Sequence, residues 1–127
     1  MADVCTAIQD SLRAAHVQVD TCALLQQVPL RTRRNGKFVK GSNAYVDLVL
    51  VRADAWLGFE VHGSRAHQSR RDVQARDQKK RTAWLALPHA HGPLVEVIAW
   101  RKTNADWHKQ MRAGVNKAVH NFVASQQ

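Results

Sequence analysis

The chain has 127 residues, 45% of them hydrophobic, and carries a formal net charge of +9. This length and apolar content favour one folded domain over a disordered chain, and the charge favours a polyanionic partner, most often a nucleic acid. No apolar run approaches the roughly 20 residues of a membrane span, no secretory signal or zinc-type cysteine motif is legible, and we expect an intracellular protein.

The first third of the chain predicts a helix followed by a hairpin. Residues 3–15 carry apolar side chains at helical spacing, and the short apolar segments 17–19 and 24–30 are strand-like. Asn35-Gly36 is a strong hairpin-turn signal, which indicates antiparallel pairing between the strands on either side. The turn is rich in cations, so we expect a positively charged tip that contacts nucleic acid through Arg31, Arg33, Arg34 and Lys37.

The central part of the chain predicts a strand–helix–strand unit. Apolar residues dominate 43–51 and 55–61, and both segments read as strands. Residues 69–82 form a polar helix capped by Ser69, and the apolar run 83–87 is expected to be the returning strand. A connection of this kind is right-handed and joins parallel strands.

The last third predicts one more strand, 94–100, and a final helix that begins after Thr103 or Asn104. The apolar stripe of that helix consists of Trp107, Met111, Val115, Ala118 and Phe122. The fold class expected from this order is α/β, with a mixed β-sheet flanked by α-helices in one domain, 1–127, whose core spans 44–100.

Two carboxylates stand out on the central strands. Asp47 and Glu60 lie in otherwise apolar segments, where an unpaired charge costs several kcal/mol. Neighbouring strands would bring them close together, and a divalent cation such as Mg²⁺ would relieve their repulsion, with phosphate oxygens completing its shell. Pairing of each carboxylate with a nearby arginine is the structural alternative, and the spacing leaves both open.

Two histidines and a basic helix follow the second carboxylate. His62 shares the strand face of Glu60, and His67 lies beyond a glycine that lets the chain turn. Either imidazole could act as general base on a metal-bound water, or could be a surface residue. The helix expected at 69–82 is either a solvated surface helix or a surface that binds a phosphate backbone. In the second case the cations expected to bind, on this helix and just before it, are Arg65, Arg70, Arg71, Arg76, Lys79 and Lys80.

These residues together resemble the PD-(D/E)XK nuclease superfamily. Asp47 in an apolar strand, Glu60-Val61-His62-Gly63 and His67 five residues after His62 are similar to the branch around the very-short-patch repair endonucleases, over roughly residues 44–100. The resemblance implies a restriction-endonuclease-like fold. It also implies a metal bound by Asp47, by the Val61 carbonyl and by Glu60, with His62 and His67 at the attacking water or scissile phosphate.

The chain departs from that family at three places. The catalytic lysine expected two residues after the acidic position is His62 here, and Lys79 or Lys80 could replace it from the helix. Ser64-Arg65-Ala66 stands where mismatch-repair members hold bulky aromatics, and the cysteines of their zinc site are missing. Metal-dependent nuclease chemistry is therefore implied without mismatch specificity.

The leading hypothesis is a small Mg²⁺-dependent DNA endonuclease or nickase, with Mn²⁺ able to substitute. A non-catalytic nucleic-acid-binding domain on the same scaffold is the alternative, since the strand lysine is absent, and an RNA-bound structural protein is a third. The sequence shows no recognisable interface patch, so both a monomer and a homodimer are possible. A monomer would more naturally nick one DNA strand.

Overall fold

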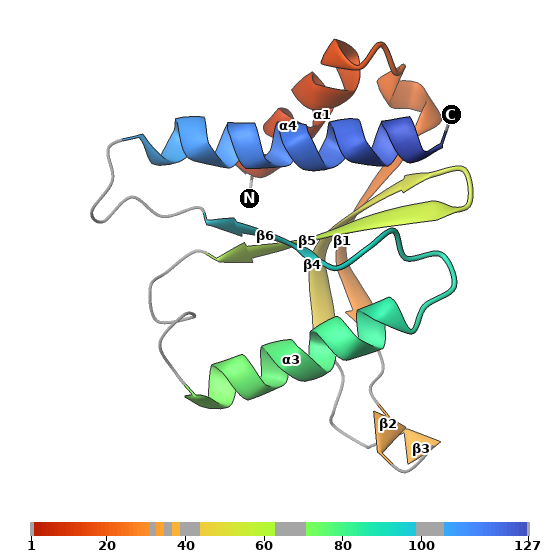
Figure 1. Ribbon diagram of the computed structural model, residues 1–127, viewed down its shortest axis with the longest axis vertical. Helices are drawn as coiled ribbons and strands as arrows, with labels where there is room; N and C mark the ends of the chain where they lie inside the picture. Colours follow the sequence, from red (N-terminus) through yellow and green to blue (C-terminus); the bar gives the residue numbers. More distant parts are fainter. Residues whose placement is uncertain are drawn as a thin grey trace.

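The computed structural model describes residues 2–30, 33–34, 37–38, 44–62, 71–98 and 106–126. Its centre is a four-stranded sheet, with α1 (Ala2–Ala14) and α4 (Trp107–Ser125) on one face and α3 (Arg71–Leu85) on the other (Figure 1). The strands of this sheet are β1 (Ala23–Leu30), β4 (Ala44–Arg52), β5 (Ala55–His62) and β6 (Val95–Ile98). The predicted fold class, α/β with a mixed sheet flanked by helices, is confirmed.

The sheet order is β1-β4-β5-β6. Strands β1, β4 and β5 pair antiparallel in succession, and β6 pairs parallel to β5. The antiparallel pairing predicted across the basic turn is confirmed, and within that turn β2 (Arg33–Arg34) pairs antiparallel with β3 (Lys37–Phe38). The predicted parallel pair across a helix is also present, but β6 supplies its second strand.

The prediction of a strand at 83–87 is wrong. Helix α3 continues through Ala83, Trp84 and Leu85, and the chain then turns toward β6. A five-residue apolar run cannot be assigned to strand or helix by periodicity alone. Part of the run packs on the sheet, since Trp84 is fully buried and Ala83 and Leu87 lie partly buried against the same cluster.

The strand-like assignment of residues 17–19 is also wrong. Val17 and Gln18 have no regular structure, and Val19–Thr21 form the short 3₁₀ helix η1. Val17 is nevertheless buried in the core, which explains its apolar character. The predicted capping residues Ser69, Thr103 and Asn104 and the turn Asn35-Gly36 lie outside the described residues.

Two buried clusters hold the layers together. On the face covered by α1 and α4, helix side chains such as Ile8 and Phe122 pack with Leu50 and Phe59 of the sheet. Burial of each such side chain contributes roughly 1.5–3 kcal/mol. The predicted stripe of the last helix is confirmed at its centre, since Met111, Val115 and Phe122 are buried, while Trp107 and Ala118 are partly exposed.

The second cluster fixes α3 on the opposite face. Trp84 packs there with Val49 and Leu94, and its indole Nε1 donates a 3.1 Å hydrogen bond to the Gly92 carbonyl. A Cβ placed on Gly58 would lie 2.8 Å from the Trp84 ring and 2.6 Å from Leu94 Cδ2. Gly58 therefore allows the helix to lie this close to β5, which places the preceding turn of α3 over the end of that strand.

None of the helices in the described ranges is long and apolar enough to cross a membrane.

Candidate functional site

The two strand carboxylates lie at the same end of the β4–β5 ladder. Leu48 pairs with Phe59 in the antiparallel register, so Asp47 and Glu60 come next on the two strands and share a face. The Val61 amide donates a 2.8 Å hydrogen bond to Asp47 Oδ2. The structure thus brings together the Asp47, Glu60 and Val61 of the predicted metal site, and the Val61 amide holds the Asp47 carboxylate against β5.

Glu60 forms an ion pair with a lysine of α3. Lys80 Nζ lies 2.8 Å from Glu60 Oε2, and the two side chains are only 16% and 12% exposed, respectively. Lys80 lies one helical turn before Trp84, on the same face of α3. Glu60 lies two residues after Gly58, on the same face of β5. The contact of Trp84 with Gly58 therefore brings Lys80 within reach of Glu60. The second carboxylate oxygen, Glu60 Oε1, is buried and has no hydrogen-bond partner among the residues described.

Burial raises the pKa of Glu60 above its ordinary value of 4.5. The hydrogen bond and the positive charge of Lys80 oppose this rise, the negative charge of Asp47 adds to it, and the backbone amide of Asp47 lowers the pKa. Desolvation is the largest cause. Glu60 is therefore a carboxylate for which one lysine does not fully replace the lost water, and further positive charge beside it would be favourable.

A second group of charges lies next to this pair. His62 is buried, with Nε2 at 3.7 Å from Glu96 Oε1 on β6, an ion-pair contact when the imidazole is protonated. Glu96 also pairs with Arg81, the neighbour of Lys80 on α3. The parallel register places Glu96 beside Glu60, so charged side chains of β5, β6 and α3 converge here.

Sequence reasoning missed Glu96 and Arg81. Glu96 alternates with Val95 and Val97 on its strand, a pattern typical of an exposed residue, and its side chain is 45% exposed. Nothing in a short alternating strand marks a residue that also contacts a buried histidine. The sequence feature that could have pointed to Glu96 is the rarity of glutamate, because the chain has only two, Glu60 and Glu96.

The other predicted site residues are placed less completely. His67, Arg31, Arg65 and Arg70 lie outside the described residues. Among the remaining cations predicted to bind nucleic acid, Lys79 is exposed on α3, whereas the neighbouring Lys80 is committed to Glu60. Backbone positions alone, in β2, β3 and α3, are described for Arg33, Arg34, Lys37, Arg71 and Arg76.

Within the described part of the chain, no three His, Cys, Asp or Glu side chains form a group that could hold a metal ion. A carboxylate pair is a different case, since Mg²⁺ is commonly held by one or two carboxylates, with water and phosphate oxygens as its other ligands. Asp47 and Glu60 fit that requirement in donor type, and the unbonded Glu60 Oε1 is an available ligand atom.

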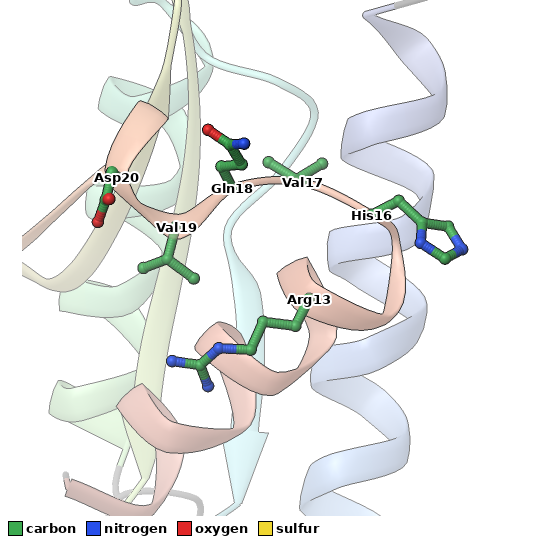
Figure 2. Close-up of a pocket in the computed structure, with 6 residues that line it drawn as sticks. All are labelled: Arg13, His16, Val17, Gln18, Val19 and Asp20. Carbon is green, nitrogen blue, oxygen red and sulfur yellow. The ribbon is translucent and has the colours of Figure 1, made fainter.

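A depression elsewhere on the surface is a weaker candidate. It lies where the chain passes from α1 to η1 and is lined by Arg13, His16, Val17, Gln18, Val19 and Asp20 (Figure 2). Figure 2 shows the Arg13 side chain extending beneath Val19 while the His16 ring points toward α4. Arg13 is already paired with Asp10 at 3.2 Å, so these side chains do not converge on a common point.

No protein-family model, curated protein or solved structure matches this chain. The resemblance to PD-(D/E)XK nucleases therefore stays a prediction, based on Asp47, Glu60 and His62 and on the cluster that surrounds them.

Proposed function

We propose that this protein is a metal-dependent DNA endonuclease or nickase of the PD-(D/E)XK kind. The observation that carries the proposal is the Asp47–Glu60 pair at the end of the β4–β5 ladder. Lys80 binds one Glu60 oxygen, and the other oxygen is buried with no partner among the described residues. Two carboxylates on a mixed sheet, with a lysine that reaches one of them from α3, are the kind of donor set that such a nuclease requires.

Asp47 and Glu60 would hold the cation, Mg²⁺ or Mn²⁺. When bound, the ion would lower the pKa of a coordinated water and neutralise charge that develops on the phosphate. The Val61 amide orients Asp47 through Oδ2. The raised pKa of Glu60 indicates a site where added positive charge is favourable, which supports a cation at this place.

Lys80 takes the place of the lysine that the strand lacks. Position 62, two residues after Glu60, is a histidine, and Lys80 reaches the same carboxylate from α3 at 2.8 Å. Its ammonium group orients Glu60 and can stabilise negative charge on a phosphate nearby. Lys80 is accordingly assigned to the reaction site and not to the general phosphate-binding surface.

His62 is assigned the proton transfer. It lies two residues after Glu60 and so shares its strand face, and Glu96 Oε1 lies near its Nε2 atom. We assign His62 to accept the proton of the attacking water, with Glu96 as a positioning residue that is itself held by Arg81. DNA is the proposed substrate because of the net charge of +9, which also fits the intracellular location expected above.

Plasmid nicking in Mg²⁺ or Mn²⁺ tests the proposal. We expect Asp47→Asn and Glu60→Gln each to lower the cleavage rate by about 10³-fold or more, because each removes a ligand charge at the reacting phosphate. Asp54→Asn is the matched control, since it makes the same change at an exposed turn position on the same hairpin. Equal cleavage by all four proteins would contradict the site.

A non-catalytic nucleic-acid-binding domain is the second candidate. The Lys80–Glu60 pair favours it, because a lysine already neutralises the buried carboxylate without any metal. This candidate predicts salt-dependent DNA binding, no cleavage with any divalent cation, and no rise in melting temperature on addition of Mn²⁺. The nicking assay and a thermal melt with Mn²⁺ separate the two.

A further inference from the structure

The outward face of α4 is a polar surface that the proposed site does not use. The helix buries Met111, Val115 and Phe122 against the sheet, on the face opposite α3 (Figure 1). Its exposed side chains include a set of hydrogen-bond donors, which we call the α4 donor face: Lys109, Arg112, Asn116, Lys117, His120 and Asn121.

Positive charge on this face has no acidic side chain to balance it within α4 itself. No Asp or Glu occurs between Trp107 and Ser125. None of the ion pairs among the described residues involves Lys109, Arg112 or Lys117. On α1 and α3, the cations Arg13, Lys80 and Arg81 have acidic partners, and Lys79 is exposed. Among the described residues, the α4 donor face therefore carries the larger group of cations outside an ion pair.

A glycine on the same helix has no structural reason within the fold. Gly114 is exposed, and a Cβ at this position would meet nothing within 4 Å. Glycine inside a helix is destabilising relative to alanine, yet no close contact with the described residues requires it here. Together with the exposed Ala113 beside it, Gly114 leaves a low surface among the donors, where another molecule could approach the helix backbone closely.

We propose that α4 is a DNA-recognition helix that enters the major groove of a duplex. The major groove admits an α-helix, and Arg, Lys and Asn are the side chains that pair with base edges and phosphates there. Small residues at Gly114 and Ala113 allow the approach. A membrane surface suits the face less well, because the apolar side of α4 is already buried in the core.

The choice of DNA as partner rests on the proposed function, but the surface is separate from the site. Asp47 and Glu60 share the sheet face that α3 covers, whereas α4 lies on the other face (Figure 1). The α4 donor face therefore contacts duplex away from the scissile phosphate. Changes on α4 should weaken binding and raise KM while leaving kcat unchanged.

Fluorescence anisotropy tests the proposal. The probe is a mixed-sequence duplex of about 20 base pairs, or two turns of DNA, and a chelator in the buffer removes divalent cations so that no cleavage occurs. For the triple variant Lys109→Gln/Arg112→Gln/Lys117→Gln we expect a dissociation constant at least about tenfold higher, and a slope of log K against log salt that is smaller by about 3. Gly114→Leu should also weaken binding while its melting temperature stays the same or rises. Arg13→Gln, which removes a cation already paired with Asp10, is the control.

Wild-type affinity and salt slope in both α4 variants would overturn the proposal. The triple variant could instead lose binding to anionic phospholipid vesicles while its DNA binding is unchanged. That result would assign the face to a membrane and would also overturn the proposal. Failure of the proposed function would give a different result. If the protein binds DNA through α4 but does not cleave it, the nicking assay shows no cleavage, whereas the α4 variants still lose affinity for DNA.

Discussion

Replacement of Lys80 by methionine is expected to lower the free energy of unfolding by about 3 kcal/mol at neutral pH, because it leaves the buried Glu60 carboxylate without its compensating charge. The two side chains are 16% and 12% exposed, so little water can replace the ammonium group. The double variant Lys80→Met/Glu60→Gln should recover most of the loss, since it removes the uncompensated charge as well. Urea unfolding of the three proteins measures both effects.

The Lys80→Met deficit should depend on pH. The pKa of Glu60 is raised above 4.5 in the folded protein, so the folded state binds this proton more tightly than the unfolded state. The stability from that proton is fully present below the unfolded pKa and is lost as pH rises through the folded pKa. Loss of Lys80 raises the folded pKa further, so the deficit should be small below pH 4.5 and grow toward neutrality.

Lys79→Met is the matched control for this experiment. Lys79 is the preceding residue on α3 and is exposed, and such surface substitutions change stability by about 0.5 kcal/mol or less. An equal, pH-independent loss in Lys79→Met and Lys80→Met would contradict the buried ion pair.

Gly58→Ala is expected to destabilise the fold by about 2–3 kcal/mol, because the added Cβ overpacks the contact between β5 and α3. It would lie 2.8 Å from the Trp84 ring, which is fully buried and cannot swing away. Relief requires α3 to move outward, and that movement carries Lys80 away from Glu60. Thermal or denaturant unfolding measures the stability.

Gly114→Ala is the control for the glycine change, since a Cβ there meets nothing within 4 Å. It should be neutral or stabilising by up to about 1 kcal/mol. If Gly58→Ala proved as stable as Gly114→Ala, the close packing of α3 on β5 would be refuted.

The closeness of Asp47 and Glu60 could be predicted from sequence, because a short link joins the two apolar strands that carry them. The partner of Glu60 could not. Lys80 reaches Glu60 only because Trp84 sits on Gly58, and Trp84 lies in the run 83–87, which has the apolar composition of a strand. Once that run is helical, α3 gains a large, fully buried anchor in Trp84, and the rotation that selects Lys80 and Arg81 follows from tertiary packing.

Glu96 shows a second limit of sequence reasoning. Its place on β6 follows from strand alternation, but its contact with His62 depends on the parallel register in which Glu60 pairs with Glu96 and His62 with Ile98. That register is set by the long crossover through α3, and no local pattern encodes it. Local alternation identifies which side chains share a face, whereas non-local pairing decides which of them meet.

Binding of Mn²⁺, followed by electron paramagnetic resonance with and without a DNA duplex, is the direct test of the Asp47–Glu60 site. We predict that wild type and the exposed control Asp54→Asn bind Mn²⁺, and that Asp47→Asn and Glu60→Gln do not. Mn²⁺ binding that survives both site substitutions, or no binding by wild type even with DNA present, would contradict the assignment of Asp47 and Glu60 as a metal site.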